Sequence, residues 1–183
     1  LFVTFSDISP LEKRELLFLS RSALETYLRE GKIIDTPNSF SLPRRQQGVF
    51  VTIRNGKEVR GCQGTLIPAK ENLHAEIIEN TIRAATSDRR YPSVSLHELN
   101  RELSRIKIQI AIVKDWVEIE GKDKLRDPKR FGLVIENGER TGVILPGEVK
   151  TSSWQYRKAC KMAGVKSGDR FRMFVFEAIV IKE

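Results

Sequence analysis

Apolar residues recur every three to four positions in several stretches of this chain, which is the spacing of helices that bury one face. These stretches are residues 10–30, 69–86, 95–103 and 151–163. The first stretch follows Ser9-Pro10 and is closed by Gly31, residues that are typical of helix starts and ends. In the third, Ser95 and Glu98 have the spacing of a capping box. The pattern therefore predicts helices at all of these places.

Alternation of apolar and polar residues predicts the strands. The clearest alternation starts at Val49 and ends at Asn55-Gly56, the favoured pair for a two-residue hairpin turn, so residues 57–64 are expected to form the return strand. A second hairpin is expected across Asn137-Gly138. Its two strands and two further ones are predicted over residues 131–136, 140–145, 106–112 and 171–181. The last of these is apolar on both faces, so we expect it inside a sheet.

Polar stretches separate these elements. Residues 35–48 predict a long loop with Arg44 and Arg45 at its tip, and residues 115–130 predict a loop with a short helical turn. Hairpins mixed with helices indicate an α+β fold with a largely antiparallel or mixed sheet and helices on one face.

The composition is that of a folded soluble domain, with 40% hydrophobic and 31% charged residues among 183. No stretch reaches the length of a membrane span, and Leu1–Phe5 lacks the basic flank of a signal peptide, so we expect a cytoplasmic protein without membrane contact. The soft metal ligands are limited to Cys62, Cys160, His74 and His97. Neither a disulfide scaffold nor a metal site is predicted, and no cofactor is expected.

The net charge of +8 is concentrated near the carboxyl end. Residues 150–172 hold seven basic side chains and one acidic one. On the predicted helix, Trp154, Arg157, Lys158 and Lys161 fall on one side, and Tyr156, Ala159, Cys160 and Ala163 on the other, which is the expected core side. The basic side is either a solvated surface or an anion-binding face that holds phosphate and stacks a base on the tryptophan.

The most unusual local feature is a cysteine between two glycines, in the run Arg60-Gly61-Cys62-Gln63-Gly64. In a regular strand, Arg60 and Cys62 project on the same face, where a guanidinium favours the thiolate. One interpretation is a reactive or ligand-contacting thiol with a cationic anchor. The other is a small buried cysteine at a β-bulge, with Arg60 paired to a carboxylate.

A polar break, Asp88-Arg89-Arg90-Tyr91-Pro92, follows the second predicted helix. Asp88 either pairs with an arginine in a structural loop, with Tyr91 filling the core, or lies near Cys62 as a polar partner or an acid–base group. We expect His74 at the surface or boundary of its helix and His97 exposed. A triad of Cys62, a histidine and Asp88 stays open, because triads are assembled in space and not in sequence.

Two of these motifs carry a resemblance to a known family. The run Gly48 to Gly64, which ends in Val59-Arg60-Gly61-Cys62-Gln63-Gly64, is similar to the Leu-Arg-Gly-Cys-Ile-Gly hallmark of the AMMECR domain. The run Ala84-Ala85 with Asp88-Arg89-Arg90-Tyr91-Pro92 resembles its Ala-Ala…Asp-x-Arg-Phe-Pro-Pro motif. Further matches lie at Gly132–Ile135, at Gly142–Pro146 and at Cys160–Val165.

The resemblance implies one α+β domain over residues 1–183, built of two packed subdomains. We expect the larger over about 1–125 plus 165–183, and the smaller over about 126–164. It implies no reaction, because the family has no established activity, so whether the protein is an enzyme stays open. Microbial relatives are associated with a Memo-type protein and a radical-SAM enzyme, and a link to RNA modification has been suggested from fold comparison.

Three functions follow as hypotheses. The first is a protein that binds RNA or DNA, linked to RNA modification, with a ligand site formed by Arg60, Gly61, Gln63, Gly64, Arg89 and Tyr91. The second is a non-catalytic adaptor for the Memo-type and radical-SAM partners. The third is a small thiol-dependent enzyme that uses Cys62 and Asp88 as catalytic residues.

Overall fold

The computed structural model describes residues 8–37, 46–102 and 105–183. Its helices are α1 (Pro10–Glu30), α2 (Leu73–Thr86), α3 (Leu96–Arg101) and α4 (Ser152–Met162), with a 3₁₀ turn, η1, at Lys122–Lys124. Its strands are β1 (Val49–Asn55), β2 (Glu58–Thr65), β3 (Ile106–Ile119), β4 (Phe131–Asn137), β5 (Arg140–Ile144) and β6 (Arg172–Lys182). The predicted loop tip at Arg44 and Arg45 lies outside the described residues.

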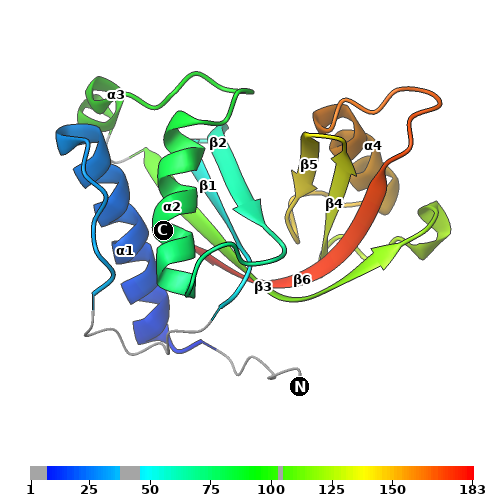
Figure 1. Cartoon of the computed structure of the whole chain (residues 1–183), viewed down its shortest axis with the longest axis horizontal. Coiled ribbons are helices and arrows are strands. Elements are labelled where there is room, and N and C mark those ends of the chain that lie inside the picture. Colours follow the sequence, from blue (N-terminus) through cyan, green and yellow to red (C-terminus); the bar gives the residue numbers. More distant parts are fainter. Residues whose placement is uncertain (1–7, 38–45, 103–104) are drawn as a thin grey trace. The chain divides into compact units, whose positions relative to one another are not determined.

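The chain forms an α+β fold, as the sequence predicts (Figure 1). The strand order is β2-β1-β3-β6-β4-β5, and the β1–β2, β1–β3, β4–β5 and β4–β6 pairings are antiparallel. The prediction that the last strand is internal is confirmed, because β6 has a neighbour on both sides. Both Asn-Gly hairpins are confirmed, with Gly56 and Gly138 at positive φ.

The structure divides into two compact units. Unit 1 comprises the described residues up to Ile112 together with Val180–Glu183, and unit 2 comprises Val113–Ile179. The long strands β3 and β6 contribute residues to both units. None of the described helices is long and apolar enough to cross a membrane.

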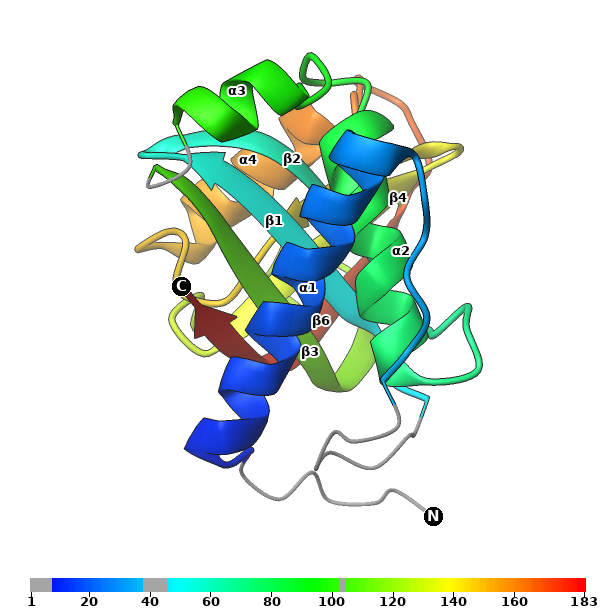
Figure 2. The same cartoon turned by 90° about the vertical axis from the view of Figure 1, so that its left-hand side faces the viewer.

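In unit 1, α2 packs on β1 and β2, and α1 packs against α2 and α3 (Figures 1 and 2). The apolar residues predicted for α2 are buried where the helix packs on the sheet and against α1: Leu73, Ile77, Ile78, Ile82 and Ala85. The ends of α1 are also as predicted. Ser9 forms a full capping box with Glu12, and Gly31 closes the helix at φ 68°.

The start of α2 corrects the prediction, because the helix begins at Leu73 and not at residue 69. The side chain of Asn72 caps the helix by accepting from Ala75 N. The buried carboxylate of Glu76 accepts from the backbone N–H of Ala69 and of Lys70, at 2.9 and 2.8 Å. These bonds hold the preceding residues in a turn outside the helix.

Two further predictions for unit 1 are corrected. His74 is 1% exposed and not at the surface, because buried residues surround the first turn of α2 on several sides. Ser95 caps α3 through Glu98 N, but the Glu98 carboxylate does not return to Ser95. It is bound to Arg60 instead, so the capping box is only half formed. His97 is exposed, as expected.

In unit 2, α4 packs on the β4–β5 hairpin. Its core holds Leu133, Ile135, Ile144, Val149, Ala159, Ala163, Met173 and Val175. The predicted loop over residues 115–130 is wrong in its first part, because β3 continues to Ile119. Trp116 packs edge-on against Phe174, and Glu118 forms a two-pronged ion pair with Arg172, so this polar segment is held in the sheet.

Candidate functional site

Cys62 lies on β2, the strand at one end of the strand order. It is half-buried and stands directly opposite Thr52 of β1, whose hydroxyl donates to its thiol at 3.3 Å. The main chain of Cys62 is turned away from β1, because its N–H and its carbonyl are bonded on the outer side of the strand. This is the geometry of a non-hydrogen-bonded pair, in which opposed side chains come closest.

The outer side of Cys62 is covered by two residues that follow α2. One carboxylate oxygen of Asp88 accepts from Cys62 N at 2.9 Å, and the guanidinium of Arg90 donates to Cys62 O at 3.1 Å. Arg90 also holds both oxygens of Asp88, at 2.8 and 2.7 Å. The Asp88–Arg90 pair thus supplies the acceptor and the donor that a neighbouring strand would supply, and it closes the free edge of β2 at this residue.

This arrangement sets the charge state of Asp88. Burial by itself raises the pKa of Asp88, but the bonds from Arg90 and from the backbone of Cys62 outweigh it, so the pKa lies below its usual range. The same contacts raise the pKa of Arg90. Asp88 is therefore a weak base with both oxygens engaged, and the geometry gives it the role of a structural partner of β2.

Gly61 explains how the end of α2 reaches this edge. A Cβ atom on Gly61 would lie 1.7 Å from the carbonyl oxygen of Ala84, so only glycine lets α2 approach β2 this closely. Asp88 follows four residues after Ala84. A Cβ on Gly64 would similarly lie 2.1 Å from the carbonyl oxygen of Val49. The two glycines of the cysteine motif therefore serve close backbone packing.

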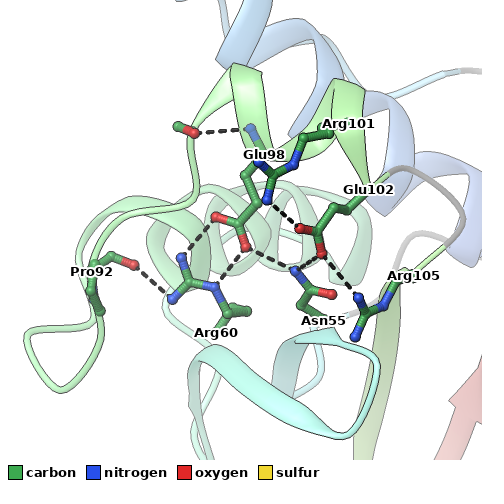
Figure 3. A network of polar contacts seen from close by, with 8 residues as sticks. Asn55, Arg60, Pro92, Glu98, Arg101, Glu102 and Arg105 are labelled. Carbon is green, nitrogen blue, oxygen red and sulfur yellow. Dashed lines mark hydrogen bonds and ion pairs between the residues drawn. The ribbon is translucent and has the colours of Figure 1, made fainter.

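Arg60 is directed to a different cluster, shown in Figure 3. Its guanidinium binds both oxygens of Glu98, at 2.7 and 2.8 Å, and also donates to Pro92 O. A register shift between β1 and β2 leaves Arg60 without an opposed residue, because Ile53 pairs with Gly61 and Arg54 with Val59. The regular alternation behind the Arg60–Cys62 expectation is thus interrupted. The guanidinium bound at Cys62 is that of Arg90.

The cluster of Figure 3 ties α3 to the first hairpin. Asn55 donates to Glu98 at 3.3 Å and to Glu102 at 2.6 Å. The bond from Arg60 is the main reason why the pKa of Glu98 lies below its usual range, and the same bond raises the pKa of Arg60. These charges are satisfied within the cluster, so its role is structural.

The remaining motif residues lie around the same edge. Tyr91 is half-buried, and the Arg90 guanidinium lies 5.5 Å from the centroid of its ring. Burial raises the pKa of the Tyr91 phenol. Arg89 is exposed, and Gln63 is half-buried opposite Val51. The structure therefore brings Cys62, Asp88 and Tyr91 together around Arg90, and it directs Arg60 to Glu98.

The second set of candidates lies on α4 in unit 2. The predicted basic face is exposed, with Trp154 50% accessible and the Arg157 guanidinium 5.3 Å from the centroid of its ring. Within the described ranges, Arg157, Lys158 and Lys161 form no ion pair. Of the other basic residues in this stretch, Arg172 is paired with Glu118 and Glu136.

Sequence reasoning missed two residues that matter locally. Arg90 belongs to the second motif but was not singled out, although its spacing of two from Asp88 favours a local ion pair. Gln155 is buried on the core side of α4 and donates to the carbonyl of Phe131 at 2.8 Å. No sequence signal marks it, because a glutamine at this position is equally compatible with a solvated helix face. No group of three or more metal-ligating side chains exists among the residues that the structure describes.

Comparison with known proteins assigns the chain to a family. The family model described as AMMECR1 matches residues 17–181, so the chain belongs to the AMMECR1 family. A protein of Thermotoga maritima is 37% identical over 151 residues, which cover 80% of this chain and 84% of the relative. A protein of Clostridium acetobutylicum is 31% identical over 178 residues, and the match covers 94% of this chain and 36% of that longer protein.

A solved structure has the same fold. The crystal structure of the uncharacterized protein PH0010 from Pyrococcus horikoshii superposes with a TM-score of 0.79 at 26% identity, covering 96% of this chain and 93% of that one. The names of these relatives state no activity. The family assignment therefore fixes the fold and leaves the function to be argued from the surface.

Proposed function

We propose that this protein binds single-stranded nucleic acid, RNA in the first place, through the exposed face of α4. The observation that carries the proposal is a half-exposed tryptophan beside cations that no described carboxylate neutralises. Trp154 offers one flat aromatic surface, and Arg157, Lys158 and Lys161 are exposed next to it on the same helix. An aromatic ring among basic side chains is the common solution for holding bases and phosphates of a single strand.

Whether a basic side chain is already bound to a carboxylate determines how well it can bind a phosphate. This criterion favours the α4 face over Arg60 and Arg90 as the phosphate-binding surface. Arg60 and Arg90 are each held by two carboxylate oxygens, so little of their charge is left for a ligand. Lysines and arginines that lack such partners release counterions from phosphates at no cost in broken ion pairs. The α4 face is therefore the favoured phosphate contact, and the Cys62 edge supports the fold.

The α4 face is also rigidly mounted. Thr151 caps the helix by accepting from Trp154 N at 3.2 Å, and Ala159 and Ala163 bury the opposite side. A Cβ on Gly142 of β5 would lie 2.0 Å from the Ala159 carbonyl oxygen, so the helix lies directly on the strand. Rigid mounting lowers the entropy lost when a strand binds.

The test is a salt titration of binding to a fluorescein-labelled oligouridylate, followed by fluorescence anisotropy. We expect affinity to fall steeply with salt, and the slope of log K against log salt to decrease by about 1.4 in the double variant Lys158→Gln/Lys161→Gln, at about 0.7 per phosphate contact. The double variant Lys57→Gln/Lys107→Gln removes the same charge from exposed positions of unit 1 and is the matched control.

Three outcomes are informative. A reduced slope in the α4 variant and an unchanged slope in the control support the proposal. Equal losses in both variants would mean that net charge alone binds RNA. Absence of binding at low salt would remove the proposed function.

A further inference from the structure

A cavity of about 500 Å³ lies in unit 1, between α2 and the extended chain that follows α1. Figure 2 shows this extended segment running beside α2. The cavity shares no lining residue with the Cys62 edge and belongs to a different unit from α4. Its volume falls within the range of cavities that hold small organic molecules, about 300–1,000 Å³.

Two apolar walls face the cavity. One is a stripe along α2 formed by Ala75, Ile78 and Ile82, which recur at helical spacing. The other is the segment after α1, where Ile33 is 69% exposed although it lines the cavity. An isoleucine left accessible opposite an apolar stripe provides surface that an apolar ligand covers with gain of free energy.

Charged side chains of both signs line the cavity. Lys70 forms an ion pair with Glu79 at 2.5 Å, and Asp35 and Glu71 add two further carboxylates to the lining. Arg83 also lines the cavity and forms no ion pair with any described residue. Glu79 lies four residues before Arg83 on α2 and is paired with Lys70. Arg83 is therefore the cation of the lining that no described carboxylate pairs.

We propose that this cavity binds a small molecule with an apolar body and a single anionic group. The apolar body lies between Ile33 and the α2 stripe, and the anion is paired with the Arg83 guanidinium. A guanidinium binds carboxylate, sulfonate and phosphate oxygens in the same two-pronged manner, so the shared chemistry is an anionic oxygen group on an apolar frame. This inference does not depend on nucleic-acid binding by α4.

The test uses 8-anilinonaphthalene-1-sulfonate, which has an apolar ring system and one sulfonate, as the probe. We expect saturable fluorescence enhancement with the folded protein, and affinity reduced about tenfold by Arg83→Gln through loss of a charge-assisted bond. Ile33→Asp is expected to weaken binding further, because it places a carboxylate beside the apolar body. Arg89→Gln and Ile67→Asp change an arginine and an isoleucine that are exposed and lie outside the lining, so they are matched controls.

A neutral probe separates charge from apolar contact. N-phenyl-1-naphthylamine lacks the sulfonate, so we expect Arg83→Gln to leave its affinity unchanged and Ile33→Asp to lower it. Circular dichroism confirms that each variant is folded. No saturable binding of the sulfonate probe, or equal binding by wild type, Arg83→Gln and Ile33→Asp, would overturn the proposal.

Discussion

Asp88 accepts a hydrogen bond from the backbone N–H of Cys62 at 2.9 Å, and this single contact joins the two motifs on which the sequence resemblance rests. Arg90 completes the contact by donating to the carbonyl of the same cysteine. Because β2 ends the strand order, this pair satisfies backbone groups that a neighbouring strand would otherwise satisfy. The closure of the sheet edge therefore gives both motifs a structural role.

The first prediction concerns the stability of this edge. Asp88→Asn removes the charge that holds Arg90 and places an amide against a backbone N–H. We expect it to lower the free energy of unfolding by about 1–3 kcal/mol, the usual cost of disrupting a buried polar contact. Urea unfolding followed by circular dichroism measures the change. Arg89→Gln is the control, because Arg89 is exposed, and a loss of similar size there would contradict the edge-closing role.

The pH dependence of stability follows from the same contact. The folded pKa of Asp88 lies below its unfolded value of about 4, so its ionised form stabilises the fold above that value. This contribution is lost as the pH falls through the folded pKa. We expect the difference in stability between wild type and Asp88→Asn to shrink below pH 4. A constant difference down to pH 2 would show that the ionisation of Asp88 does not contribute.

A second prediction tests the close packing at Gly61. Gly61→Ala places a methyl group on the carbonyl of Ala84, so α2 must move off β2. We expect a loss of about 1–3 kcal/mol or more in the free energy of unfolding. Gln63→Ala on the same strand is the control, since its half-buried side chain makes no such approach. Equal stability of Gly61→Ala and wild type would show that the glycine is dispensable.

A third prediction uses the two cysteines as reporters. The edge closed by Asp88 and Arg90 shields the backbone around Cys62, so we expect Asp88→Asn to speed its alkylation by iodoacetamide. Cys160 is half-buried in unit 2 and provides an internal reference in the same sample. Peptide mass spectrometry gives both rates. Faster labelling of Cys62 alone supports local opening, whereas equal acceleration of both thiols indicates global unfolding and contradicts it.

The hypothesis that Cys62 is a catalytic nucleophile predicts a different result for iodoacetamide labelling. A nucleophilic cysteine reacts as a thiolate, so its labelling by iodoacetamide in the folded protein rises at a pH well below the ordinary thiol range. Labelling of Cys62 with an ordinary pH profile would leave that hypothesis without support.

The helices and hairpins follow from the sequence because their signals are local. The alternation from Val49 and the Asn55-Gly56 turn determine the first hairpin, and Ser9 and Gly31 mark the ends of α1. The predictions fail where contacts with residues distant in the sequence determine the local structure. β3 continues past residue 115 because Phe174 and Arg172 of β6 hold it. No local pattern contains that information.

In the candidate site, too, features set by the local sequence were predicted better than those set by distant contacts. The sequence left open whether Asp88 pairs with an arginine or lies near Cys62, 26 residues away, and the structure shows both contacts. The sequence did not indicate that Glu98 is the carboxylate bound to Arg60. The register shift between β1 and β2 interrupts the regular alternation of side chains on which the prediction for Arg60 was based. Helical periodicity correctly predicted that Trp154, Arg157, Lys158 and Lys161 of α4 are exposed, but it did not mark Gln155 as buried.

The central claim is that binding lies on α4 and that the cysteine motif supports the fold. The direct measurement is the affinity for the labelled oligouridylate at low salt, compared among wild type, Lys158→Gln/Lys161→Gln and Cys62→Ala. We predict that the α4 variant loses about tenfold or more in affinity while Cys62→Ala binds as wild type does. Unchanged affinity in the α4 variant, or loss of binding in a folded Cys62→Ala protein, would contradict the claim.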